Sequence, residues 1–197
     1  MDFNAIIKRV IAIITKPAEE WEVIKNESMT VGDMFLKYAI FLAAIPAIAG
    51  FIGFAMLGGS FLMQYVVKYA LIWAIMTYVM QLVGVFVIGF VIDALATNFG
   101  SQKDMVGSMK TAVFSLTPYW VASILLIIPV LGILGMVVGG LYALYLLYLG
   151  IKIVKNPPQD KLMGYFIISL IVAAVVFWLI NFIARVVAFP HYTIPVM

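Results

Sequence analysis

The sequence predicts an all-α membrane protein, a polytopic bundle of five transmembrane helices preceded by short amphipathic helices at the membrane surface. Hydrophobic residues make up 65% of the 197 residues and charged residues only 11%, whereas soluble domains are about half apolar and a quarter charged. The apolar residues also form runs of about 20 or more, which is the length that crosses a bilayer as a helix. We therefore divide the chain into a cytoplasmic N-terminal segment, 1–34, and a membrane domain, 35–197.

The composition also limits the kinds of catalysis and binding that the protein can carry out. The chain has no cysteine, which excludes disulfides, iron–sulfur clusters and thiol catalysis. The net charge of +3 is typical of basic cytoplasmic loops and calls for no nucleic-acid partner. There is no HExxH zinc motif, and neither a serine nor an acid is expected beside the single histidine, His191. We expect a protein that is not an enzyme and that carries no cofactor or metal.

The N-terminal segment should form two short helices. Read as a helix, residues 3–14 place one apolar stripe along a face that Lys8 and Arg9 avoid, so this helix should lie on the membrane surface. Pro17 suits the first turn of a second helix, in which Trp21 would dip into the interface. We expect Trp21, Lys8 and Arg9 to be the interfacial residues. The favoured interpretation is that both helices pack against the bundle as a lid, and the alternative is that they sense lipid or a partner.

Five spans account for the apolar runs. The first should kink at Pro46, and its Ala39, Ala43 and Ala47 form a line of small residues that lets another helix approach closely. The sequence IPVLG at 128–132 supplies the proline and glycine of a tight turn between the third and fourth spans. The expected spans are 35–57, 66–92, 111–128, 133–154 and 163–187.

The positive-inside rule provides an independent check on this count. Five spans place the N-terminus and the loops 93–110 and 155–161 on one side of the membrane. Ten of the twelve basic residues then lie on that side, and only Lys68 and Arg185 lie on the other. We therefore predict a cytoplasmic N-terminus and an external C-terminus. A reporter fused to the C-terminus should be active outside the cytoplasm, and a cytoplasmic signal from a folded fusion would contradict the topology.

Four stretches carry patterns of proline, glycine and aromatic residues: YAIFLAAIPAIAGFIG at 38–53, IDALATNFG at 92–100, FSLTPYWVA at 114–122 and IPVLGILGMVVGGLYALYLLYLGI at 128–151. Together they resemble the Yip family, the five-span membrane proteins named for interacting with Ypt/Rab GTPases, and specifically its short bacterial branch. The resemblance implies a five-helix bundle with a cytoplasmic N-terminus. In eukaryotic members it also implies partners bound through a long N-terminal region with a DLYGP-type stretch. The short segment 1–34 lacks this stretch, so GTPase binding is not expected.

Asp93 is the main candidate for chemistry, because ionisable residues inside membranes are costly and are by default candidates for function. It follows directly on a long apolar run. One interpretation makes it a helix boundary that caps backbone N–H groups or pairs with Lys103 or Lys110. The other gives it a role in handling protons or ions.

Deeper polar residues are few, and ordinary interhelical hydrogen bonds would explain them. Gln81 belongs to the second span, and Asn181 and Arg185 lie four residues apart on the fifth. The sequence favours a non-enzymatic Yip-type protein of the bacterial inner membrane that organises the membrane or binds lipid or protein partners, with homo-oligomerisation through small-residue faces such as Gly135/Gly139 as one possibility. The alternative is a small ion, proton or solute transporter or channel that uses Asp93, Gln81 and Asn181.

Overall fold

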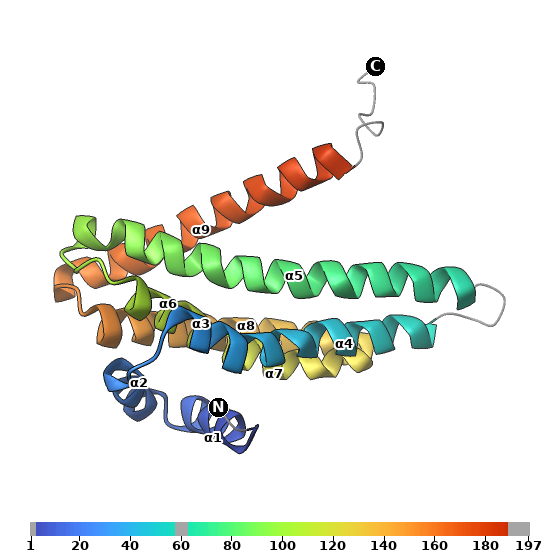
Figure 1. The fold of residues 1–197 in the computed structure, drawn as a ribbon, viewed down its shortest axis with the longest axis horizontal. Helices are drawn as coiled ribbons and strands as arrows, with labels where there is room; N and C mark the ends of the chain where they lie inside the picture. Colours follow the sequence, from blue (N-terminus) through green and yellow to red (C-terminus); the bar gives the residue numbers. More distant parts are fainter. Residues whose placement is uncertain (1–2, 58–62, 189–197) are drawn as a thin grey trace.

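The computed structural model describes residues 3–57 and 63–188, and this part of the chain is helical, without strands. Two short helices, α1 and α2, precede a bundle of long ones (Figure 1). Several helices continue through a tighter or wider turn, so that one span can contain more than one helix. The helices are α1 Phe3–Thr15, α2 Pro17–Asn26, α3 Val31–Met34, α4 Ile40–Leu57, α5 Met63–Leu95, α6 Met105–Ser115, α7 Thr117–Ala122, α8 Pro129–Gly150 and α9 Gln159–Ala188.

Five helical segments are long and apolar enough to cross a membrane, which confirms the predicted fold class. A π-helical turn, Phe35–Ala39, joins α3 to α4, and another, Ile151–Lys155, extends α8. Two 3₁₀ turns follow α5 and α7. The candidate spans are Val31–Phe54, Ala70–Phe99, Met105–Ile127, Val130–Lys155 and Gln159–Val176.

The third span begins earlier than the sequence indicated. We expected a loop over 93–110, but α6 starts at Met105, and the Asp104 carboxylate accepts a hydrogen bond from the Val106 N–H at 3.1 Å as its N-cap. Every residue from Gly107 to Ser115 is buried, including Lys110. The charge of Lys110 favoured a loop in the sequence, yet α6 is the central element of this end of the bundle.

Small residues bring the helices together within the chain. Ala39 and Ala43 are fully buried. A Cβ added at Gly139 would lie 2.8 Å from both the Cβ of Ala122 and the carbonyl oxygen of Pro118, so α8 packs directly on the α7 backbone. Gly135 approaches the Ala122 carbonyl oxygen in the same way. These faces are therefore used for packing within one chain, whereas the sequence left open that they join separate copies.

The N-terminal helices dock on the flank of one end of the bundle (Figure 1). Ile6, Ile13, Trp21 and Ile24 are buried in the same core as residues of α4, α6 and α8. Trp21 is fully buried, and a Cβ on Gly150 would lie 2.9 Å from its indole ring. The expectation that Trp21 contacts the membrane interface is therefore wrong, because Gly150 leaves room for the ring inside the protein.

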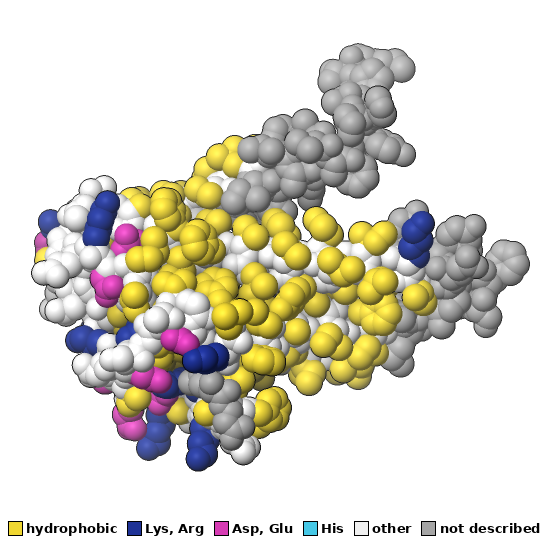
Figure 2. Space-filling model, in the orientation of Figure 1, with side chains coloured by type: hydrophobic (Ala, Val, Ile, Leu, Met, Phe, Trp, Pro, Cys, Tyr) yellow, Lys and Arg dark blue, Asp and Glu magenta, His cyan; other side chains and the backbone are white. Residues whose placement is uncertain are grey.

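Figure 2 shows how charge and apolar surface are divided on the face it presents. Charged side chains gather over the end formed by α1, α2 and the connections between the long helices, and a belt of hydrophobic side chains covers the middle of the bundle. Many large hydrophobic side chains of the long helices are more than one-third exposed, such as Phe86, Val138 and Ile171. Such an apolar surface is stable only in contact with lipid or a protein partner.

Candidate functional site

A polar cluster connects the last turn of α5 with α6 and α8. The Asp93 Oδ1 atom accepts hydrogen bonds from the Asp104 backbone N–H at 2.8 Å and from the Ser108 hydroxyl at 3.3 Å. The Lys155 ammonium lies 3.9 Å from the same oxygen. Asp93 thus holds the N-cap residue of α6 and pairs with a lysine of the π-helical turn that extends α8. The sequence suggested instead that Asp93 caps its own following turn or pairs with Lys103 or Lys110.

Lys155 is the cation at the centre of this cluster. Its side chain is only 2% exposed, and its ammonium donates to the carbonyl oxygens of Gln102 at 2.9 Å and Asp104 at 3.2 Å. The Ser101 hydroxyl donates in turn to the Lys155 carbonyl oxygen. A buried ammonium requires such partners because losing water without replacement is costly. The cluster therefore fixes the connection between α5 and α6.

A second polar cluster holds the N-terminal helices in place. The Arg9 guanidinium forms ion pairs with Glu20 and Glu27, and it lies 5.6 Å from the centroid of the Phe114 ring. Only 10% of the Arg9 side chain is exposed, so its predicted place at the membrane interface is wrong. Lys8, its neighbour, is exposed.

Lys110 and Tyr142 complete this docking. The Lys110 ammonium donates to the carbonyl oxygens of Lys25 at 3.2 Å and Glu27 at 2.6 Å, at the C-terminal end of α2. Carbonyl groups at a helix C-terminus lack helical partners and carry partial negative charge, so they bind a cation well. The Tyr142 hydroxyl donates to the Ile14 carbonyl oxygen at 2.8 Å. The two helices therefore form the lid that the sequence favoured.

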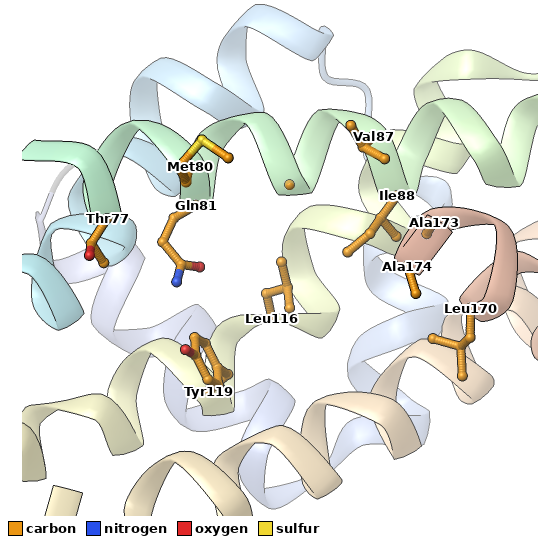
Figure 3. Close-up of a pocket in the computed structure, with 11 residues that line it drawn as sticks. Thr77, Met80, Gln81, Val87, Ile88, Leu116, Tyr119, Leu170, Ala173 and Ala174 are labelled. Carbon is orange, nitrogen blue, oxygen red and sulfur yellow. The ribbon is translucent and has the colours of Figure 1, made fainter. Parts of the chain in front are cut away.

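The remaining candidate site is an intramembrane groove between α5, α7 and α9 (Figure 3). It has a volume of about 480 Å³, and its walls are apolar except for Thr77, Gln81 and Tyr119. A neighbouring hollow of about 460 Å³ shares Tyr119 and Leu170 with it and extends along α8. The lining residues of the groove are Thr77, Met80, Gln81, Gly84, Val87, Ile88, Leu116, Tyr119, Leu170, Ala173 and Ala174.

The groove opens because α9 leaves α5. The two helices meet near the charged end, where Ala173 packs with Val87 and Val91, and they diverge toward the other end (Figure 1). Both α5 and α9 belong to membrane-spanning segments at this depth. The groove therefore opens at the depth of the membrane-spanning segments.

Gln81 is the polar side chain of the groove whose hydrogen bonding is best defined. Its Oε1 atom accepts a hydrogen bond from the Trp120 indole N–H at 3.1 Å. Because an indole nitrogen can only donate, the amide nitrogen of Gln81 must be the group directed elsewhere, and Figure 3 shows the amide pointing into the groove. No described residue accepts a hydrogen bond from that nitrogen. Among the described residues, the groove thus presents a donor without an acceptor at membrane depth.

The residues expected for transport do not share this groove in the described structure. Gln81 lines it, but Asp93 lies about 18 Å farther along α5 at 1.5 Å per residue and belongs to the polar cluster instead. Asn181 and Arg185 fall in the last part of α9, and their side chains are outside the described part. The sequence did not reveal the contacts of Lys155, Lys110 and Trp120, because their partners are distant in the chain.

These features define the class of protein. It is a small helical membrane protein whose N-terminal helices cover its polar end and whose body is apolar and faces lipid. A sequence model described as the Yip1 domain matches residues 11–180. The chain belongs to the Yip1 domain family, which confirms the resemblance seen in its sequence.

Two relatives carry the name inner membrane protein YohC. The protein from Escherichia coli strain K12 is 29% identical over 161 residues, which covers 79% of this chain and 83% of the relative. The protein of the same name from Escherichia coli O6:H1 matches with the same identity and coverage. No solved structure matches the chain. Family and fold together make the chain an integral membrane protein.

Proposed function

We propose that this protein is a non-enzymatic, partner-binding organiser of the bacterial inner membrane, and that its groove receives a transmembrane helix of another membrane protein. The N-terminal segment, 1–34, faces the cytoplasm as a lid on the membrane domain, 35–197, and the C-terminus is external. The inner-membrane name of the relatives supports the location. The basic residues of the polar end support the orientation.

The observation that carries this proposal is that the Gln81 amide nitrogen lies in an apolar groove that opens to lipid and has no acceptor among the described residues. A lipid acyl chain would fill the groove but would leave the donor unsatisfied, which is unfavourable where no water is present. A helix that carries a polar side chain can supply the acceptor. The small residues Gly84, Ala173 and Ala174 also line the groove, and small residues allow helix backbones to approach.

The arrangement of the charged groups supports a role in binding rather than catalysis. Asp93, Lys155, Arg9 and Lys110 are engaged in ion pairs or hydrogen bonds that join helices. None of these groups lines the groove. The described residues therefore place the charges where they hold the fold together and leave the groove for packing.

A photo-crosslinking residue at Ala174, on the groove wall, tests the proposal in cells. We expect a discrete adduct with a membrane protein, and we expect Gln81→Leu to weaken it by about threefold to twentyfold, since an interhelical hydrogen bond contributes about 0.6–1.7 kcal/mol. Trp120→Phe is the matched control: it removes the hydrogen bond within the chain but leaves the Gln81 amide in the groove, so the adduct should persist.

The same probe at Ile75, exposed on α5 but outside the groove, should give no such adduct. Lipid adducts alone at position 174 would contradict the proposal. So would a protein adduct that is unchanged by Gln81→Leu, because binding would then not depend on the groove donor.

A further inference from the structure

Helix α1 has two apolar faces, and only one of them is used by the fold. Ile6 and Ile13 are 5% and 0% exposed and pack into the core. Phe3, Ile7 and Ile11 are 68%, 42% and 56% exposed. The last three residues are four apart and form one line along the helix, which we call the outer stripe. No described part of the chain covers the outer stripe.

The outer stripe lies between the buried face and a polar face. At about 100° per residue, Ile7 and Ile11 are turned away from Ile13 on one side and from the exposed Lys8 on the other. The helix therefore has three sectors, directed toward protein, an apolar medium and water. A lid helix lying between the bundle and water would need only the first and third sectors.

The position of α1 identifies the apolar medium. Its C-terminal end is tied to Tyr142, within the fourth span, and it packs against α7, within the third. Both spans contribute to the apolar surface of the bundle, for example Ile124 and Leu141. The outer stripe thus belongs to a helix that packs against two candidate membrane spans with exposed apolar side chains.

We propose that α1 is embedded in the membrane leaflet adjacent to the N-terminal helices, with the outer stripe in the acyl chains and Lys8 among the lipid phosphates. This is how an interfacial amphipathic helix binds a bilayer. Because Arg9 ties α1 to α2 through Glu20, and Glu27 extends the same ion-pair cluster, the inserted helix adds volume to one leaflet at a fixed place beside the bundle. The inference deepens the proposed membrane-organising function but does not depend on the groove.

The natural lack of cysteine allows a direct test with single-cysteine variants of the full chain. Ile7→Cys, Ile11→Cys, Lys8→Cys and Ile13→Cys are each spin-labelled and reconstituted in vesicles of phosphatidylethanolamine and phosphatidylglycerol. Collision rates are measured with oxygen, which concentrates in acyl chains, and with a water-soluble nickel chelate. Positions 7 and 11 should favour oxygen, position 8 should favour nickel, and position 13 should be reached weakly by both.

Two outcomes would overturn the inference. If labels at positions 7 and 11 collide with nickel as often as the label at position 8, the outer stripe faces water. If they are shielded from both reagents, as at position 13, the stripe is covered by protein. Should Ile13→Cys disturb the docking of α1, positions 7, 8 and 11 still distinguish lipid from water and from protein. Neither result affects the crosslinking expected in the groove, so each of the two proposals can be contradicted without the other.

Discussion

Replacing Lys155 with methionine should lower the free energy of unfolding by about 3–5 kcal/mol, as expected when one partner of a buried ion pair is removed. The substitution leaves Asp93 without its cation, 3.9 Å away in the native protein. It also removes the donor that the Gln102 and Asp104 carbonyl oxygens share. Thermal unfolding in detergent micelles, followed by circular dichroism, measures the loss.

Lys152→Met is the matched control for this variant. Lys152 belongs to the same π-helical turn but is exposed, so its loss should change stability by less than about 0.5 kcal/mol. A double variant, Lys155→Met with Asp93→Asn, should recover part of the loss, because it removes the unpaired charge. Equal melting temperatures for Lys155→Met and Lys152→Met would contradict the structural role of the cluster.

Gly139→Ala should destabilise the protein by about 1–3 kcal/mol, the usual cost of overpacking. The new methyl group would lie 2.8 Å from the Pro118 carbonyl oxygen and 3.0 Å from the Tyr119 Cα. These are backbone atoms of α7, so α8 can accept the methyl group only by moving away. The expected result is a lower midpoint of denaturation in micelles containing increasing sodium dodecyl sulfate.

Gly140→Ala provides the comparison, because the nearest atom to its added Cβ is the Tyr119 Cδ2 at 4.0 Å. Both variants gain the same helix propensity of alanine over glycine, so the difference between them isolates the close contact with α7. A smaller loss for Gly139→Ala than for Gly140→Ala would show that α8 does not pack on α7 in this way.

The span count could be predicted because length and composition are local properties of the sequence. A run of about 20 apolar residues must cross the bilayer wherever its neighbours lie. The start of α6 could not be predicted in this way. The charge of Lys110 favours a loop when the sequence alone is considered. Its burial depends on the carbonyl group of Lys25, which lies 85 residues away in the chain.

The candidate site was predicted only in part for the same reason. Gln81 was identified as a polar residue at membrane depth, but its role depends on Trp120, 39 residues away. Arg9 and Trp21 were assigned to lipid because each belongs to a short amphipathic helix. That pattern does not distinguish a helix that lies on a membrane from a helix that packs on a helical bundle. In our proposal α1 has both neighbours, the bundle on one face and lipid on the other.

The docking of the lid also constrains the synthesis of the protein. Ile14 is made long before Tyr142, which lies 128 residues later and binds its carbonyl oxygen. At about 5–20 residues per second, roughly 6–26 s pass between the two. Throughout that interval the buried face of α1 lacks its contact with the fourth span, and the nearest apolar environment is the bilayer beside the translocon. The N-terminal helices of the nascent chain can therefore complete their docking on the bundle only after the fourth span has been synthesised.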